Sequence, residues 1–504
     1  MVRVEKILFY LLLFCLPFQT RLILKEWFFR RSLGGGGGAE FNEWNSAFLY
    51  LTDLFILAIL SLWFYRSRIS WLSAKHGQKI NIILGLFFAL SALSLSGAQN
   101  SGLGIYQLIK LAEFIFLFLY LKNNFTPHLF GQASSNTKER KPIGGSALTK
   151  PIFLRASAGK GAGFKLNRVY QVLIASGLLQ SFIAIWQFAF QKDLGLRILG
   201  ESFLSPNIEG AAKIVVSGTK MLRAYGTFPH PNVLAAFLLF SIFSFYFFYL
   251  KFKKPSLCSN LISLSVFTFL TLGLFLTFSR IPIILFFFFS ICLFLVLFFK
   301  KKFYKLYHSK TLLISSLFLF AVILCVALML PEFYSRFVEK SVDPGIHLRY
   351  FYNFISLSML KENPFFGQGI GNFVWKLQDF QGSLRAANLI YKLDVPEIEI
   401  IPHEAPSWLF QPAHNVYLLI AAEIGVVGAL LFLVFLSLII VPLIKIIKEN
   451  NLFFIFYFLF FIFLALSLFD HFFWTLQQGR LMFWILCGIL ASFSLDKKIS
   501  DAKL

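Results

Sequence analysis

The residues best suited to chemistry lie where a long polar stretch meets an apolar one, at His414 and Asn415. An imidazole has an ordinary pKa of about 6.5, so His414 could orient or deprotonate a hydroxyl near neutral pH. A structural alternative stays open, because either residue could cap the helix that begins there. Gly425 and Gly428 follow inside the apolar stretch, and we expect them to permit close helix packing.

Arginines could bind a phosphate-bearing ligand beside this imidazole. Arg280 lies in TFSRIP (277–282), which separates two apolar stretches with almost no loop, so its charge must sit at the edge of the helix bundle. A guanidinium pairs with two oxygens at once and stays charged. Arg223 and Arg349 offer the same chemistry, and three arginines on one side could hold a diphosphate. For any single arginine, the alternative is contact with lipid phosphate.

The sequence predicts no metal and no cofactor. Asp-x-Asp, the usual signature of a metal-dependent sugar-nucleotide enzyme, occurs nowhere in the chain. Glu397 and Glu399 have the spacing of a metal pair, but we interpret them as part of an exposed acidic loop.

Composition places these residues in a membrane protein. The 504-residue chain is 58% hydrophobic and only 14% charged, far from the balance of a soluble domain. Repeated apolar runs match the roughly 30 Å of hydrocarbon that a helix must cross, whereas a barrel would show short alternating segments. We therefore predict an all-α, polytopic membrane protein. Its net charge of +23 then reflects basic residues at helix ends rather than binding of nucleic acid.

Apolar length and flanking charges predict about twelve transmembrane helices. The spans are 4–20, 46–65, 80–97, 103–121, 169–190, 232–250, 259–278, 282–299, 311–330, 414–444, 452–470 and 480–495. Four short basic loops then share one side, which identifies it as the cytoplasm and places both termini there. In the first outer loop, Arg21, Lys25, Arg30 and Arg31 oppose the rule.

The spans divide the chain into three parts. Residues 1–330 hold helices one to nine with a basic cytoplasmic linker at 122–168, residues 331–413 form a large extracytoplasmic loop between helices nine and ten, and residues 414–504 hold helices ten to twelve and a cytoplasmic tail. Within the loop, 346–361 has helical spacing and should lie on the membrane surface or cap the bundle. Gly34–Gly38 and 131–167 are typical of flexible connections.

This topology collects the candidate groups on the outer face. They are Arg223, Arg280, Arg349, His414, Asp470, His471 and Arg480.

At these residues the chain resembles the O-antigen ligase and polymerase superfamily of integral membrane glycosyltransferases. The ligase-type signature matches His414-Asn415, nine residues, then Gly425-Val-Val-Gly428. Four further stretches resemble family positions: Arg223-Ala-Tyr-Gly226-Thr-Phe with Pro231-Asn232, Thr277-Phe-Ser279-Arg280, Arg349 with the segment 363–373, and Asp470-His-Phe-Phe-Trp474 with Gln478-Gly479. Ile281-Pro282 departs from the small residue that often follows the Ser-Arg pair.

The resemblance implies a metal-independent, inverting transfer of a glycan from undecaprenyl diphosphate to an acceptor hydroxyl, at the outer face of a bacterial cytoplasmic membrane. Arg223 and Arg280 would bind the diphosphate and stabilise its departing charge, and His414 would activate or orient the acceptor. Substrate binding would involve Arg349, Asn415, Asn232, Asp470, His471 and Arg480.

Other functions stay open at this point. The acceptor would distinguish a ligase from a polysaccharide polymerase or a protein O-oligosaccharyltransferase, and the sequence does not choose among them. A lipid-linked glycan transporter or flippase is the alternative of another class, but such proteins often show internal repeats and ionisable groups near the midplane, which we do not find here.

Overall fold

The computed structural model describes residues 1–27, 42–67, 78–125, 164, 166–208, 210–252, 256–299, 301–338, 344–380, 410–449 and 454–501. The described chain is mostly helical, as predicted. The linker segments Gly34–Gly38 and most of 131–167, together with Glu397 and Glu399, lie outside the described residues.

Each predicted span overlaps one long helix. These are α1 (Val2–Cys15), α2 (Leu51–Ser67), α3 (Gln78–Leu93), α4 (Ser101–Asn124), α5 (Leu166–Phe190), α6 (Pro231–Phe252), α7 (Leu257–Phe275), α8 (Arg280–Phe299), α9 (Lys301–Leu328), α15 (Val416–Glu449), α16 (Phe454–Leu466) and α18 (Gln477–Asp501). Seven described helices are long and apolar enough to cross a membrane, and a bent pair raises that number to eight. A count of twelve crossings stays a prediction.

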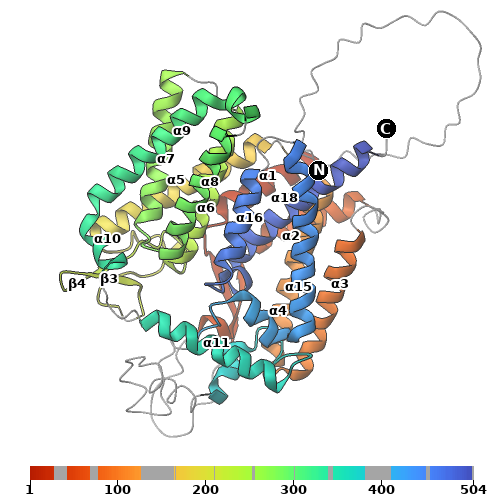
Figure 1. Cartoon of the computed structure of the whole chain (residues 1–504). Helices are drawn as coiled ribbons and strands as arrows, with labels where there is room; N and C mark the ends of the chain where they lie inside the picture. The colour runs from red at the N-terminus through yellow and green to blue at the C-terminus, as the bar shows by residue number, and fades with distance from the viewer. Residues whose placement is uncertain are drawn as a thin grey trace, which may run out of the picture.

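The helices form two groups that are joined by α1, α16 and α18. Helices α5, α7, α8 and α9 pack on one side, and α2, α3, α4 and α15 lie on the other, with α1, α16 and α18 between them (Figure 1). In α6, 94% of the most apolar stretch is buried, against 28–44% in the other six apolar helices. Helix α6 is enclosed because it packs against α5, α7, α8 and α9 of the first group and also against α16 and α18.

Two small β-hairpins were not predicted. Strand β1 (Arg21–Glu26) pairs with β2 (Ser46–Tyr50), and β3 (Lys213–Val216) pairs with β4 (Thr219–Leu222), both antiparallel. The second hairpin turns at Ser217 and Gly218, which both have positive φ, the backbone conformation that a two-residue hairpin requires. The all-α prediction is therefore right for the bundle and wrong for these loops.

The first hairpin also accounts for two of the four basic residues that opposed the positive-inside rule, whereas Arg30 and Arg31 lie outside the described residues. Arg21 forms an ion pair with Glu43 and lies over the ring of Phe48, 4.1 Å from its centroid. Lys25 lies 5.2 Å from the ring centroid of Trp27. These charges are held by partners within the protein, so they do not act as cytoplasmic anchors.

One end of the bundle is covered by short helices. Helix α9 bends by 86° into α10 (Leu330–Phe337), and α11 (Pro344–Glu362) runs across this end and packs on α15 (Figure 1). The prediction of a helix at 346–361 is confirmed. The chain continues through α12 (Phe373–Lys376) and the turn Leu377–Phe380, while α17 (Phe472–Thr475) links α16 to α18.

Helix α15 is broken at Gly425, where φ is 85° and ψ is 174°. The carbonyls of Ala422 and Glu423 accept hydrogen bonds from the amides of Gln368 (2.9 Å) and Gly369 (3.0 Å). Beyond the break, the amide of Val426 donates to the carbonyl of Pro364 at 2.8 Å. The predicted role of Gly425 in helix packing is therefore wrong, because this glycine admits the backbone of a loop.

We expect Gly425→Ala to destabilise the protein strongly. An added Cβ would lie 2.1 Å from the carbonyl oxygen of Phe365, and the positive φ alone costs about 1–2 kcal/mol in an L-residue. Thermal unfolding in detergent measures the effect. The control is Gly85→Ala on α3, where an added Cβ meets no atom within 4 Å. Equal melting temperatures for the two variants would contradict the proposed close approach.

Candidate active site

A cavity of about 240 Å³ lies beside the predicted catalytic residues. Its lining includes four arginines, two histidines, one asparagine and one aspartate: Arg223, Arg280, Arg336, Arg349, His230, His414, Asn232 and Asp470. They come from six separate segments between the β4–α6 loop and the α16–α17 junction. We call this space the arginine cavity.

Arg223 is almost completely buried, with 6% of its surface exposed. Its Nε donates to the carbonyl of Thr277 at 2.6 Å, and its Nη2 donates to Asn232 Oδ1 at 3.0 Å and to Ser279 Oγ at 2.8 Å. The TFSR junction therefore supplies both a carbonyl and a hydroxyl to a guanidinium from a different loop. These bonds fix the position of the charge at the cavity wall.

Asn232 links this arginine to Asp470. Its Oδ1 accepts from Arg223 and from Ser279 (2.9 Å), while its Nδ2 donates to Asp470 Oδ2 at 2.8 Å. The other carboxylate oxygen, Oδ1, accepts from the backbone amide of His471 at 2.8 Å. The chain Arg223–Asn232–Asp470 thus joins opposite charges through one amide.

Arg280 binds the end of α10. Its Nε and Nη2 both donate to the carbonyl of Arg336, at 3.1 and 2.9 Å. Arg336 in turn donates from Nε to the carbonyl of Phe278 at 3.5 Å. The bend between α9 and α10 therefore brings a second guanidinium to the cavity beside the predicted one.

Arg349 reaches the same cavity from α11. It makes no hydrogen bond to the residues that the structure describes, although its charge acts on His414 and Asp470. Each of the other three guanidinium groups donates hydrogen bonds to described residues.

Asn415, not His414, caps α15. Asn415 Oδ1 accepts from the amides of Tyr417 (3.0 Å) and Leu418 (3.1 Å). The imidazole of His414 instead stacks on Tyr352, with ring centroids 5.9 Å apart, and meets His471 edge-on at 4.9 Å. Its Nδ1 is buried with no hydrogen-bond partner among the described residues, so Nε2 is the nitrogen that a substrate can reach.

Burial makes the imidazoles of this region weak bases. Burial, followed by the charge of His471, lowers the pKa of His414 to about 3. Burial and then Arg223 lower the pKa of His230 to about 3. Burial alone would raise the pKa of Asp470, but His471, His414, His230 and Arg349 together lower it to about 2. Near neutral pH the site therefore holds neutral imidazoles, one carboxylate and several guanidinium groups.

Three of these groups could in principle hold a metal ion. His414, Asp470 and His471 each present a ligand atom, and these atoms lie within 4.8 Å of one another. Histidine nitrogen and carboxylate oxygen are ordinary zinc ligands. However, both oxygens of Asp470 already accept hydrogen bonds, and the surrounding arginines oppose a further dication. The donor types fit a metal, but the local charge does not favour one.

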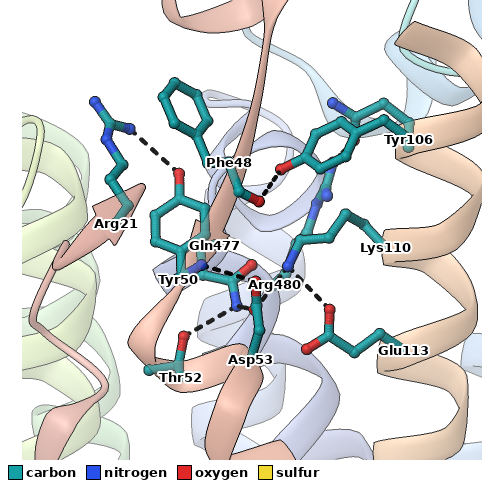
Figure 2. A network of polar contacts seen from close by, with 11 residues as sticks. Arg21, Phe48, Tyr50, Thr52, Asp53, Tyr106, Lys110, Glu113, Gln477 and Arg480 are labelled. Atoms are coloured by element: carbon teal, nitrogen blue, oxygen red, sulfur yellow. Dashed lines mark hydrogen bonds and ion pairs between the residues drawn. The ribbon is translucent and has the colours of Figure 1, made fainter. Parts of the chain in front are cut away.

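Arg480 lies in a different place from the other predicted residues. It lines a small cavity of about 40 Å³ with Lys110 and Glu423, and its Nη2 donates to Gln107 Oε1 at 2.7 Å. Nearby, Lys110 binds Asp53 (2.7 Å) and Glu113 (2.9 Å) (Figure 2). These bonds connect α2, α4 and α18, so this group of residues serves helix packing.

Most of the predicted residues meet at one cavity, and the others lie elsewhere. Arg223, Arg280, Arg349, His414, Asn232 and Asp470 line the arginine cavity, and His471 lies next to it. Asn415 caps α15. Arg480 does not line the arginine cavity and instead lines the separate cavity of about 40 Å³. Sequence reasoning missed His230 and Arg336, although His230 immediately precedes the Pro231-Asn232 motif and Arg336 follows the ninth predicted span.

Comparison with known families agrees with the motifs. Residues 264–433 match the family model described as O-Antigen ligase. This range contains Arg280, Arg349, His414 and Gly425, whereas Arg223 and the Asp470 junction lie outside it. The predicted resemblance is confirmed. No curated protein matches the chain.

The depressed pKa values predict an unusual pH profile. A catalytic imidazole with the ordinary pKa would give a rise in kcat/KM centred at about pH 6.5. Burial instead lowers the pKa of His414 to about 3. In the substrate-free protein the imidazole is therefore already neutral throughout the ordinary range, and we expect kcat/KM for the substrate that binds first to be flat between about pH 5 and 8. A rise centred near the ordinary histidine pKa would contradict this assignment.

We expect the purified protein to contain no stoichiometric metal and to keep its melting temperature in a chelator, because the arginines oppose a dication beside Asp470. Elemental analysis and thermal unfolding with and without EDTA test this. The expectation would be contradicted by a bound metal that is lost in Asp470→Asn but kept in Asp53→Asn. That result would show that His414, Asp470 and His471 bind a metal ion.

Proposed function

We propose that this chain, which resembles the O-antigen ligase family, transfers a glycan from undecaprenyl diphosphate to an acceptor hydroxyl at the outer face of a bacterial cytoplasmic membrane. The observation that carries the proposal is the convergence of four arginines and the accessible side of His414 on one cavity. Guanidinium groups match the geometry of phosphate oxygens and keep their charge in a poorly solvated site.

The diphosphate would occupy the arginine cavity. Arg349, which is least committed to other residues, would meet the donor first, while Arg223 and Arg280 are already held in place by hydrogen bonds. As the bond between the sugar C1 and the diphosphate oxygen breaks, negative charge accumulates on the leaving group. Fixed positive charge at that point stabilises the transition state without reorganisation.

His414 would receive the acceptor hydroxyl through Nε2. Attack of this oxygen on C1 forms the new glycosidic bond, and the hydroxyl proton passes to the imidazole. A bound diphosphate would place negative charge beside His414 and raise its pKa, so the group becomes a better base only when the donor is present. Attack from the side opposite the leaving group inverts the anomeric carbon, and no metal takes part in these steps.

Variants of Arg280 and His414 test the proposal with a purified protein and an undecaprenyl-diphosphate glycan. We expect Arg280→Ala and His414→Gln each to lower kcat/KM by about 100-fold or more, the usual effect of removing a group that stabilises developing charge. Arg280→Lys should recover part of the rate, because it keeps the charge without the two-pronged geometry.

Arg197→Ala is the matched control. Arg197 belongs to the loop before β3 and contacts Phe203, outside the arginine cavity, so its removal should leave the rate unchanged. Full activity in Arg280→Ala and His414→Gln would contradict the mechanism. Movement of the unaltered lipid-linked glycan across vesicles, with no transfer, would identify a flippase instead.

A further inference from the structure

A second cavity of about 340 Å³ adjoins the arginine cavity. The two share four lining residues, which are His230, Gln411, His414 and Asp470. His414 therefore lines both spaces. A volume of this size falls within the range of small-molecule sites, about 300–1,000 Å³.

The two cavities differ sharply in charge. Four arginines line the first, but no lysine or arginine is found among the described residues that line the second. The second is instead bounded by the carboxylates of Glu43 and Asp470. An anionic group would lose water there without gaining a cationic partner, so the second cavity disfavours phosphate or carboxylate.

Trp44 supplies an aromatic wall to the second cavity. Its ring meets His471 edge-on, with centroids 5.0 Å apart. Asn42 holds it in place, because Asn42 Oδ1 accepts from the backbone amide of Trp44 at 2.9 Å. The indole Nε1 donates to no atom of the described residues, so it is available to a ligand. An aromatic face with a polar edge suits a molecule that is apolar on one face and rich in hydroxyls at its rim.

Glu43 offers a hydrogen-bond acceptor next to this ring. Its Oε1 pairs with Arg21, and Arg21 itself is not part of the cavity lining. The ion pair holds the Glu43 carboxylate from outside the cavity and leaves its Oε2 to accept hydrogen bonds from hydroxyl groups. Tyr225, on the opposite loop, uses its hydroxyl to accept the amide of Ala212 at 2.6 Å, so its ring position is fixed as well.

We propose, resting on the proposed transfer reaction, that the second cavity is the acceptor subsite and that it takes an uncharged sugar. The sugar ring lies against Trp44, its hydroxyls bind Glu43 and Trp44 Nε1, and its reacting hydroxyl reaches His414 across the shared wall. The donor diphosphate stays in the arginine cavity. Among the acceptors left open by the sequence, this favours a neutral glycan over a protein hydroxyl. It also disfavours any acceptor sugar that carries a phosphate.

Steady-state kinetics of Trp44 variants test the subsite. We expect Trp44→Ala to raise the KM for a neutral oligosaccharide acceptor about tenfold, with the KM for the lipid-linked donor unchanged. Trp44→Phe keeps an aromatic face and should lie between the wild type and Trp44→Ala. Trp186→Ala is the control, because Trp186 lies on α5 and contacts Phe190, outside both cavities. A rise in donor KM alone would overturn the assignment.

The charge argument has its own test with a neutral oligosaccharide and its phosphorylated form. The wild type should prefer the neutral acceptor by at least about tenfold, and Glu43→Gln should narrow this preference. Arg21→Gln breaks the same ion pair from outside the cavity and should not narrow it. Equal use of both acceptors by the wild type, or preferred transfer to a Ser/Thr peptide, would overturn the proposal.

A binding measurement separates failure of this inference from failure of the proposed function. If the wild type transfers glycan but acceptor KM does not depend on Trp44, only the subsite is wrong. If no transfer occurs, the proposed function fails, and binding of the neutral oligosaccharide to wild-type and Trp44→Ala protein still decides the subsite. Equal affinities, or no binding to either, would refute it.

Discussion

A buried guanidinium must be paired, and the way Arg223 is paired organises the site. Its donors are satisfied by a carbonyl and a hydroxyl from the α7–α8 junction and by the side chain of Asn232 at the start of α6. Asn232 in turn donates a hydrogen bond to Asp470 at the α16–α17 junction. Leaving such a charge unpaired away from water would cost several kcal/mol, so these segments are held together by the same requirement that places the charge.

The same arrangement produces two cavities of different character. Arginines approach from one side of Asp470, where the bend between α9 and α10 and the crossing helix α11 bring Arg336 and Arg349 to the wall. On the other side, the hairpin β1–β2 and its Glu43–Asn45 turn contribute a carboxylate and an indole. His414 borders both spaces, which is the geometry that a transfer between a charged donor and an uncharged acceptor would use.

Glycine-dependent backbone contacts hold the start of α15 in relation to this site. The segment 364–372 has three glycines with positive φ, Gly367, Gly369 and Gly371, and its amides bind the carbonyls exposed by the break at Gly425. These contacts are made by backbone atoms, so they depend on the absence of a Cβ more than on any side chain. The break at Gly425 therefore connects the segment 364–372 to the helix that begins just after His414.

Much of the architecture follows from local sequence. Apolar runs predicted the helices because a membrane helix must satisfy its own backbone hydrogen bonds over a set length. The helix at 346–361 was predictable from spacing alone, and the motifs around Arg280 and His414 predicted the resemblance that the family model then matched. The Ser217-Gly218 dipeptide could also have indicated a turn, because Ser-Gly is one of the pairs that mark turns between short strands.

Which residues meet was decided by the tertiary structure. Asn415 and His414 are neighbours in sequence, yet one caps α15 and the other lines two cavities. Arg480 shares a predicted face with Arg223 but packs into a separate polar cluster. Trp44 lies more than 400 residues from His471, and no local pattern reveals that their rings touch. Periodicity specifies the faces of a helix, whereas the convergence of distant side chains depends on how the helices pack. Only the tertiary structure could therefore bring the two cavities together at one imidazole.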